Sequence, residues 1–166
     1  LETAQRLTMA IEIERRFLVH QDISRLCVFG QRIVQGYMPA GGTAKIRIRV
    51  VGARGYLTIK GDRVGSSRTE FERGISAATA WSMLTRVDPS TLIEKVRYKV
   101  AHEGLTWEVD VFEGRNAGLV IAEVELSYPD QPVALPAWVG RDITADKRYG
   151  NSTLAVRPVT RLDLAA

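Results

Sequence analysis

The sequence predicts a mainly β fold of the α+β kind, in which eight antiparallel strands close into a barrel with a few flanking helices. Eight segments show the period-two alternation of apolar and polar residues that is typical of half-buried strands. Turn-forming residues separate many of these segments, as they do in antiparallel hairpins. Because an open sheet of this size would leave edge strands exposed, we expect a closed or nearly closed barrel.

The predicted strands are interrupted by one clear helix. The eight strands are predicted at Ile11–Val19, Arg32–Met38, Ala44–Val51, Gly55–Gly61, Ser67–Ile75, Ile93–His102, Leu105–Glu113 and Leu119–Ser127. The helix is predicted to begin after Ser76, its N-cap, and to run to about Val87, where Asp88–Pro89 ends it. Short helical turns are also expected near Gln21–Phe29 and Ala137–Ile143.

The length and composition indicate one packed domain. The chain has 166 residues, and a domain usually has roughly 100–200. With 45% hydrophobic and 25% charged residues, the composition excludes collagen, coiled coils and intrinsic disorder. We expect a single domain over residues 9–157, an added or disordered segment over residues 1–8, and a C-terminal tail over residues 158–166.

The sequence also bears on the surroundings of the protein. No apolar run approaches the roughly 20 residues that cross a bilayer, and the start does not resemble a secretory signal. The single cysteine, Cys27, cannot form an internal disulfide or supply a thiolate metal site by itself. We therefore expect a cytoplasmic monomer or homodimer with no membrane partner.

The positive charge comes mostly from arginine. Of the 23 basic residues, 18 are arginine, whose rigid fork of donors suits phosphate or carboxylate. This bias favours an oxyanion-binding protein, although a general preference for arginine codons would produce it too. Because the basic residues alternate along strands and do not form one patch with stacking aromatics, we expect no nucleic-acid partner.

Ionisable residues occupy one phase of the alternation in seven of the eight predicted strands. Like charges recur two residues apart on single strands: Glu12 with Glu14, Arg47 with Arg49, Lys95 with Arg97, and Glu123 with Glu125. A solvent-exposed face with cross-strand ion pairs would also explain the alternation. Like-charged pairs, however, are costly unless an opposite charge binds between them. If this phase faces the interior of a barrel, a polyphosphate with a divalent cation is the natural occupant.

The charged motifs follow one another in a distinctive order. They are Glu12–Arg16, Arg47–Arg49, Leu57–Lys60, Arg68–Glu72, Lys95–Tyr98, Trp107–Phe112, Ala122–Leu126 and Asp146–Tyr149. The first is similar to the E-x-E-x-K signature of the CYTH domain superfamily, the triphosphate tunnel metalloenzymes, and the whole set resembles the short bacterial members. Arg16 departs from that signature, because lysine is usual there; it keeps the charge in a wider fork.

This resemblance implies a tunnel of eight antiparallel strands that binds triphosphate compounds with a divalent metal, Mg²⁺ or Mn²⁺. It implies catalytic roles for Glu12, Glu14, Arg16 and Asp110, phosphate contacts for Arg47, Arg49, Lys60, Arg68, Lys95 and Arg97, and metal binding by Glu12, Glu14, Glu72, Glu123 and Glu125. The Asp146–Tyr149 segment could cap one mouth of the tunnel or form a plain surface turn.

The resulting hypothesis is metal-dependent hydrolysis of inorganic triphosphate to pyrophosphate and phosphate. Phosphoryl transfer mainly requires positioning and charge neutralisation, which this inventory of side chains supplies. The alternatives are other triphosphate enzymes, namely a thiamine triphosphatase, a nucleoside triphosphatase or an adenylate cyclase, and a non-catalytic module that binds polyphosphate.

Overall fold

The computed structural model describes the backbone of residues 8–39, 45–64 and 67–160, and the side chains of residues 13–39, 46–59 and 70–160. Its strands are β1 (Thr8–Leu18), β2 (Gly30–Pro39), β3 (Lys45–Val51), β4 (Arg54–Val64), β5 (Ser67–Ser76), β6 (Ile93–His102), β7 (Leu105–Phe112) and β8 (Val120–Glu125). Each of the eight predicted strands is confirmed. Residues 1–7 of the predicted N-terminal segment lie outside the described residues, but Thr8 already belongs to β1.

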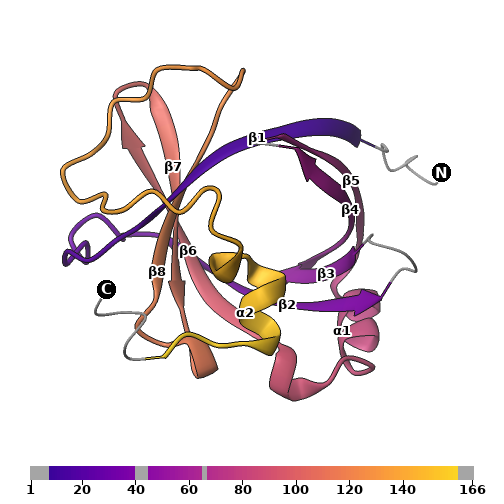
Figure 1. Cartoon of the computed structure of the whole chain (residues 1–166). Coiled ribbons are helices and arrows are strands. Elements are labelled where there is room, and N and C mark those ends of the chain that lie inside the picture. The colour runs from indigo at the N-terminus through magenta and orange to yellow at the C-terminus, as the bar shows by residue number, and fades with distance from the viewer. Residues whose placement is uncertain (1–7, 40–44, 65–66, 161–166) are drawn as a thin grey trace.

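The strands form a closed barrel in the order β1-β5-β4-β3-β2-β6-β7-β8 (Figure 1). Strand β1 closes the ring because its two halves pair with different neighbours. Residues Thr8–Ile13 pair with β5, and residues Glu14–Leu18 pair with β8. All pairings are antiparallel, so the predicted fold class is confirmed.

The first helix, α1 (Ala77–Leu84), packs against the outside of the barrel. Ser76 is its N-cap as predicted, because its hydroxyl accepts from the amide of Thr79. The α-helix ends three residues before the predicted Val87, since the amides of Arg86 and Val87 bond to the carbonyls of Met83 and Leu84, three residues back, in the tighter 3₁₀ pattern. At Gly55 of β4 a Cβ would lie 2.6 Å from that of Ala80, so only glycine permits this approach.

The segments predicted around the other helical turns differ from one another in the structure. Asp88 caps a short 3₁₀ turn, η1 (Pro89–Thr91), by accepting from the amide of Ser90. The Gln21–Phe29 segment contains the expected single turn, in which the amides of Leu26 and Cys27 bond to the carbonyl of Ile23 and Asp22 accepts from the amide of Ser24. The Ala137–Ile143 segment is not helical, because its backbone bonds to β1 at Leu18.

Two further short turns and one helix were not predicted. They are η2 (Gly114–Asn116), η3 (Lys147–Tyr149) and α2 (Asn151–Val156). Figure 1 shows α2 lying across the ring of strands. Tyr149 and Leu154 are buried there against inward residues of the barrel, including Phe112 and Ile121. The Asp146–Tyr149 segment therefore caps one end of the barrel.

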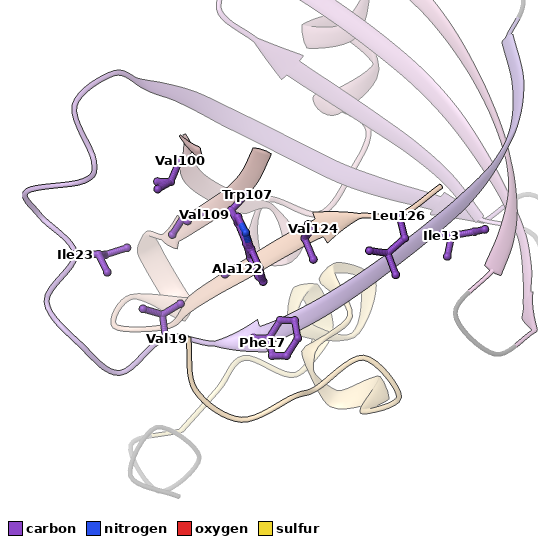
Figure 2. Packing of buried hydrophobic residues seen from close by; sticks show 10 residues of the cluster. All are labelled: Ile13, Phe17, Val19, Ile23, Val100, Trp107, Val109, Ala122, Val124 and Leu126. Atoms are coloured by element: carbon purple, nitrogen blue, oxygen red, sulfur yellow. The ribbon is translucent and has the colours of Figure 1, made fainter. Parts of the chain in front are cut away.

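The largest apolar cluster lies on the outer side of the barrel wall, over β1, β7 and β8 (Figure 2). Its centre is Trp107, which is fully buried between Phe17 and Trp138, with ring centroids at 5.6 and 5.7 Å. The loop after β8 supplies Trp138 and so covers this face. Because apolar residues pack outside the wall, the opposite phase of each strand faces the interior.

The helices of the described residues are all too short or too polar to cross a lipid bilayer.

Candidate active site in the barrel interior

The strand register brings the charged phase of the strands to one surface, the inside of the barrel. Residues that pair directly across antiparallel strands share a face. These pairs include Arg47 with Thr58, Thr58 with Glu72, Arg97 with Asp110, Glu108 with Glu123, Arg16 with Glu123, and Glu14 with Glu125. Charged side chains from separate strands therefore line the same inner surface of the barrel, as the sequence pattern predicts.

One side of this wall holds a dense ion-pair cluster on β6, β7 and β8. Lys95 and Asp110 are fully buried, and the Lys95 Nζ atom lies 2.5 Å from Asp110 Oδ2. Arg97 grips the same carboxylate through Nε at 2.6 Å and Nη2 at 2.7 Å. Arg97 also donates to Glu108 and, at 2.8 Å, to Glu123. The two cations of β6 thus have matched carboxylates.

The ionisation of this cluster follows from burial and pairing. Burial alone would raise the pKa of Asp110, but Lys95 and Arg97 together lower it well below the ordinary value. Burial lowers the pKa of Lys95 to about 8, against the opposing effect of Asp110. Asp110 is therefore a permanent carboxylate that fixes both cations in place.

On the opposite side, Arg47 of β3 is also buried and paired. Its Nη2 atom lies 3.3 Å from Glu72 Oε2 and 3.4 Å from Glu70 Oε1, and donates to the Thr58 hydroxyl at 3.1 Å. Thr58 donates in turn to Glu72 at 2.8 Å. The structure therefore places Glu72, a predicted metal ligand, beside Arg47.

Arg49, the neighbour of Arg47 on the same face, differs. Across the described part of the chain, it has no carboxylate within ion-pair distance, and its buried Nε atom has no hydrogen-bond partner. Burial, together with the nearby charges of Arg47 and Arg97, lowers the pKa of Arg49 to about 10, against the smaller opposing effects of Tyr37 and Glu72. An uncompensated guanidinium inside a barrel is suited to an anionic ligand.

Arg16 of β1 is buried, as expected for a site residue, but it is engaged by the C-terminal cap. Its Nη1 atom donates to the carbonyl of Tyr149 at 3.2 Å, and its Nε atom lies 3.9 Å from Glu14 Oε1. The wide fork of arginine can contact the cap and the carboxylate together, which the compact lysine usual at this position cannot do in the same way.

Three predicted site residues have side chains outside the described set: Glu12, Lys60 and Arg68. Their backbone positions are described. Glu12 of β1 pairs with Arg68 of β5, and Lys60 of β4 pairs with Glu70 of β5. The predicted roles of their side chains stay predictions.

The predicted metal ligands fall into two groups. Glu14, Glu123 and Glu125 lie on the adjacent strands β1 and β8, with Glu14 opposite Glu125, whereas Glu72 lies on β5 beside Arg47. Among the described side chains, no three acidic, histidine or cysteine groups converge tightly enough to hold an ion as they stand. The donor set of Glu14, Glu123 and Glu125 nevertheless fits a hard divalent cation, because all three offer carboxylate oxygens on one face.

Three neutral residues of the interior were missed by sequence reasoning. Gln35 and Tyr37 project from β2, the one strand without charges in the inward phase, and Gln35 donates to the Tyr37 hydroxyl at 2.7 Å. Asn151 of α2 accepts from Lys95 at 3.2 Å. The break in the charge pattern at β2 was a usable signal for the first two; Asn151 had none, because α2 was not predicted.

Comparison with known proteins identifies the family. A model of the CYTH domain matches residues 10–157. The chain belongs to the CYTH domain family. The match begins within β1 and extends through the rest of the barrel and the α2 helix.

Named relatives and a solved structure agree with this family. The chain is 43% identical over 150 residues to an inorganic triphosphatase of Acetivibrio thermocellus, covering 90% of this chain and 96% of the relative. It is 34% identical over 149 residues to an inorganic triphosphatase of Nitrosomonas europaea, covering 87% and 97%. The crystal structure of an inorganic triphosphatase superposes with a TM-score of 0.65 at 32% identity, covering 87% of this chain and 94% of that one.

Proposed function

We propose that this CYTH domain hydrolyses inorganic triphosphate to pyrophosphate and orthophosphate inside its barrel, with the help of a divalent cation. The observation that carries this proposal is the wall of inward cations, in which Arg49 has no carboxylate of its own among the described residues. Both named relatives, which span nearly the same length, are inorganic triphosphatases. Triphosphate is a compact polyanion that matches such a wall.

The cationic side chains of the barrel have two different roles in the proposed binding of triphosphate. We propose that Arg49 contacts phosphate oxygens directly, because no described carboxylate pairs with its buried guanidinium. Arg47, Lys95 and Arg97 add positive potential while their carboxylates hold them in position. At about 4 Å and an effective dielectric near 20, each opposite-charge contact contributes on the order of 4 kcal/mol before desolvation. Several such contacts offset the dehydration of the polyanion.

A divalent cation fits the carboxylates on β1 and β8. We propose that Glu14, Glu123 and Glu125, together with Glu12, hold Mg²⁺ or Mn²⁺. Such an ion, when bound, neutralises phosphate oxygens and polarises the terminal phosphorus toward attack by water. Arg97 already donates to Glu123 and thereby orients one of these carboxylates. No protein nucleophile is required, since phosphoryl transfer depends on positioning and charge.

The competing functions are hydrolysis or cyclisation of larger, organic triphosphates, and binding of polyphosphate without catalysis. A thiamine triphosphatase, a nucleoside triphosphatase or an adenylate cyclase would act on an organic triphosphate, and a binding module would hold polyphosphate without turnover. The cap over one barrel end by Tyr149 and Leu154 favours a short ligand. A cytoplasmic location and a monomeric or homodimeric state stay predictions.

The test is phosphate release from tripolyphosphate, pyrophosphate and ATP with Mg²⁺, with Mn²⁺ and with a chelator. We expect rapid release from tripolyphosphate with either ion, much slower release from ATP, and none with the chelator. Glu14→Gln should lower the rate with the metal ions, whereas Glu94→Gln, a half-buried carboxylate of the outer face that pairs with Arg32, should not. Faster turnover of ATP, formation of cyclic AMP, or tight binding of tripolyphosphate without turnover would each contradict the proposal.

A further inference from the structure

Among the described side chains, β2 is the one strand without a charged residue in its inward phase. That phase holds Gln31, Ile33, Gln35 and Tyr37, between the arginines of β3 and the lysine and arginine of β6. Gln35 is fully buried, with 0% exposure, although glutamine is seldom fully buried. A buried amide that satisfied all its bonds within the protein would need no further explanation.

Gln35 does not satisfy all its bonds. Its Nε2 atom donates to the Tyr37 hydroxyl at 2.7 Å, which fixes the direction of the amide. Its Oε1 atom is buried and has no hydrogen-bond partner. A buried polar atom without a partner is costly, and in native proteins such an atom requires an explanation.

Arg49, which pairs with Gln35 across the strands, has a buried donor without an acceptor. Arg49 lies directly opposite Gln35 in the register of β2 and β3, so the two side chains share the inner face. The buried Nε atom of Arg49 has no acceptor, just as Oε1 of Gln35 has no donor. The structure thus places the residue with the unused donor and the residue with the unused acceptor directly opposite each other on neighbouring strands.

These two atoms select the kind of group that fits between them. A fully ionised phosphate oxygen can accept from Arg49, but it has no hydrogen to give to Gln35. A water molecule both accepts and donates, so it satisfies Arg49 and Gln35 together. Its remaining lone pair is then directed by two fixed protein atoms. An acceptor beside phosphate-binding arginines is therefore suited to water and not to the polyanion.

We propose that Gln35 orients the water molecule that attacks the terminal phosphorus, with Arg49 as its second contact. This inference rests on the proposed triphosphatase function. The water oxygen forms a bond to the terminal phosphorus while the bond from that phosphorus to the bridging oxygen breaks. Pyrophosphate departs with the electron pair of the broken bond, and both hydrogens of the water remain on orthophosphate until solvent removes them. Glutamine serves to orient the attacking water in other phosphoryl-transfer enzymes.

The test is steady-state kinetics of Gln35→Met on tripolyphosphate with Mg²⁺. Methionine keeps the length of the side chain and removes the amide oxygen. We expect kcat to fall about 10- to 100-fold with KM changed less than about twofold, because the lost contact acts on the water and not on the bound substrate. The matched control is Gln21→Met, an exposed glutamine in the loop after β1 that donates to the carbonyl of Ala137, which should leave both parameters unchanged.

A second variant keeps the test decisive if Gln35→Met folds poorly. Gln35→Glu retains an acceptor oxygen for water and adds a negative charge that repels phosphate. The kcat of Gln35→Glu should be higher than that of Gln35→Met, and its KM should be higher than that of the wild type. Wild-type kcat in Gln35→Met, or a rise in KM alone, would overturn the inference. If the wild-type protein itself fails to hydrolyse tripolyphosphate, the proposed function fails instead, so the two failures are distinct.

Discussion

The two cation pairs of the inner wall have the same spacing in the sequence but different surroundings in the barrel. Lys95 and Arg97 of β6 share the carboxylate of Asp110, and Arg97 also reaches Glu108 and Glu123. On β3, Arg47 is paired, but Arg49 has no carboxylate partner among the described side chains. The β6 cations are thus held by direct carboxylate contacts, whereas Arg49 of the β3 pair has no such contact among the described side chains, and we propose that a ligand supplies it.

Because of this difference, we expect the two pairs to contribute differently to folding stability and to ligand binding. A buried ion pair with good geometry is strongly destabilised when one partner is removed, because the other charge remains buried alone. A buried charge without a partner lowers stability as it stands, and such groups occur where a ligand supplies the opposite charge. Substitutions on β6 and β7 should therefore affect folding first, and substitutions at Arg49 should affect ligand binding first.

The largest effect is expected for Asp110→Asn, which leaves two buried cations without their shared carboxylate. The free energy of unfolding should fall by about 3–5 kcal/mol, measured by denaturant titration. The control is Asp142→Asn, which removes an exposed ion pair with Arg15 and should cost less than about 1 kcal/mol. Equal losses in the two variants would show that the buried cluster is not a scaffold.

The same carboxylate should make the protein sensitive to acid. The pKa of Asp110 is lowered in the folded state, so the unfolded chain takes up its proton first as the pH falls. Its contribution is complete above about pH 4, the ordinary range of an aspartate, and is lost progressively below it. Unfolding free energies measured between pH 5 and pH 2 should fall steeply in the wild type and less steeply in Asp110→Asn. Parallel slopes would contradict this assignment.

The two arginines of β3 should respond differently to the same substitution. Arg47→Met breaks contacts with Glu70, Glu72 and Thr58 and should lower stability by about 2–3 kcal/mol. Arg49→Met removes a charge without a described partner and should leave stability unchanged or raise it by up to about 1 kcal/mol. Thermal and denaturant unfolding of both variants measures the contrast. A comparable loss in Arg49→Met would mean that Arg49 is a structural residue.

The smallest effect concerns the cap. Asn151→Ala removes the acceptor that α2 offers to Lys95 and should lower stability by about 1 kcal/mol. Thr153→Ala on the same helix is the control and should change stability by less than about 0.5 kcal/mol. Denaturant unfolding of both proteins tests whether α2 is tied to the charged wall. No difference between them would show that the contact with Lys95 contributes nothing.

Much of the fold could be predicted because the barrel repeats one simple rule. Seven of the eight predicted strands carry ionisable residues in one phase of the alternation, so the charged phase and the apolar phase separate onto opposite faces. The α1 helix could be predicted from Ser76 and its cap. The α2 helix could not, because its six residues, Asn151–Val156, are too few to show a helical period. It is held by tertiary packing of Leu154 against the barrel.

The candidate site could be predicted as a set of charges but not as an arrangement. The spacing of Arg47 with Arg49 and of Lys95 with Arg97 is identical, and only the register shows which cation faces a carboxylate. Gln35 also escaped the sequence pattern, because its significance comes from an unpartnered atom and not from its residue type. Pairing across strands is a property of the fold and is not encoded in any single segment.

The central claim is that triphosphate binds to Arg49, the inward arginine without a carboxylate partner among the described side chains. Isothermal titration of tripolyphosphate into the wild type, Arg49→Met and Arg32→Met, with a chelator to prevent turnover, tests it directly. Arg32 is an exposed arginine of the outer face, paired with Glu94 and Glu113. Affinity should fall at least about tenfold in Arg49→Met and stay at the wild-type value in Arg32→Met. Equal affinity in all three proteins, or equal losses in both variants, would contradict the account.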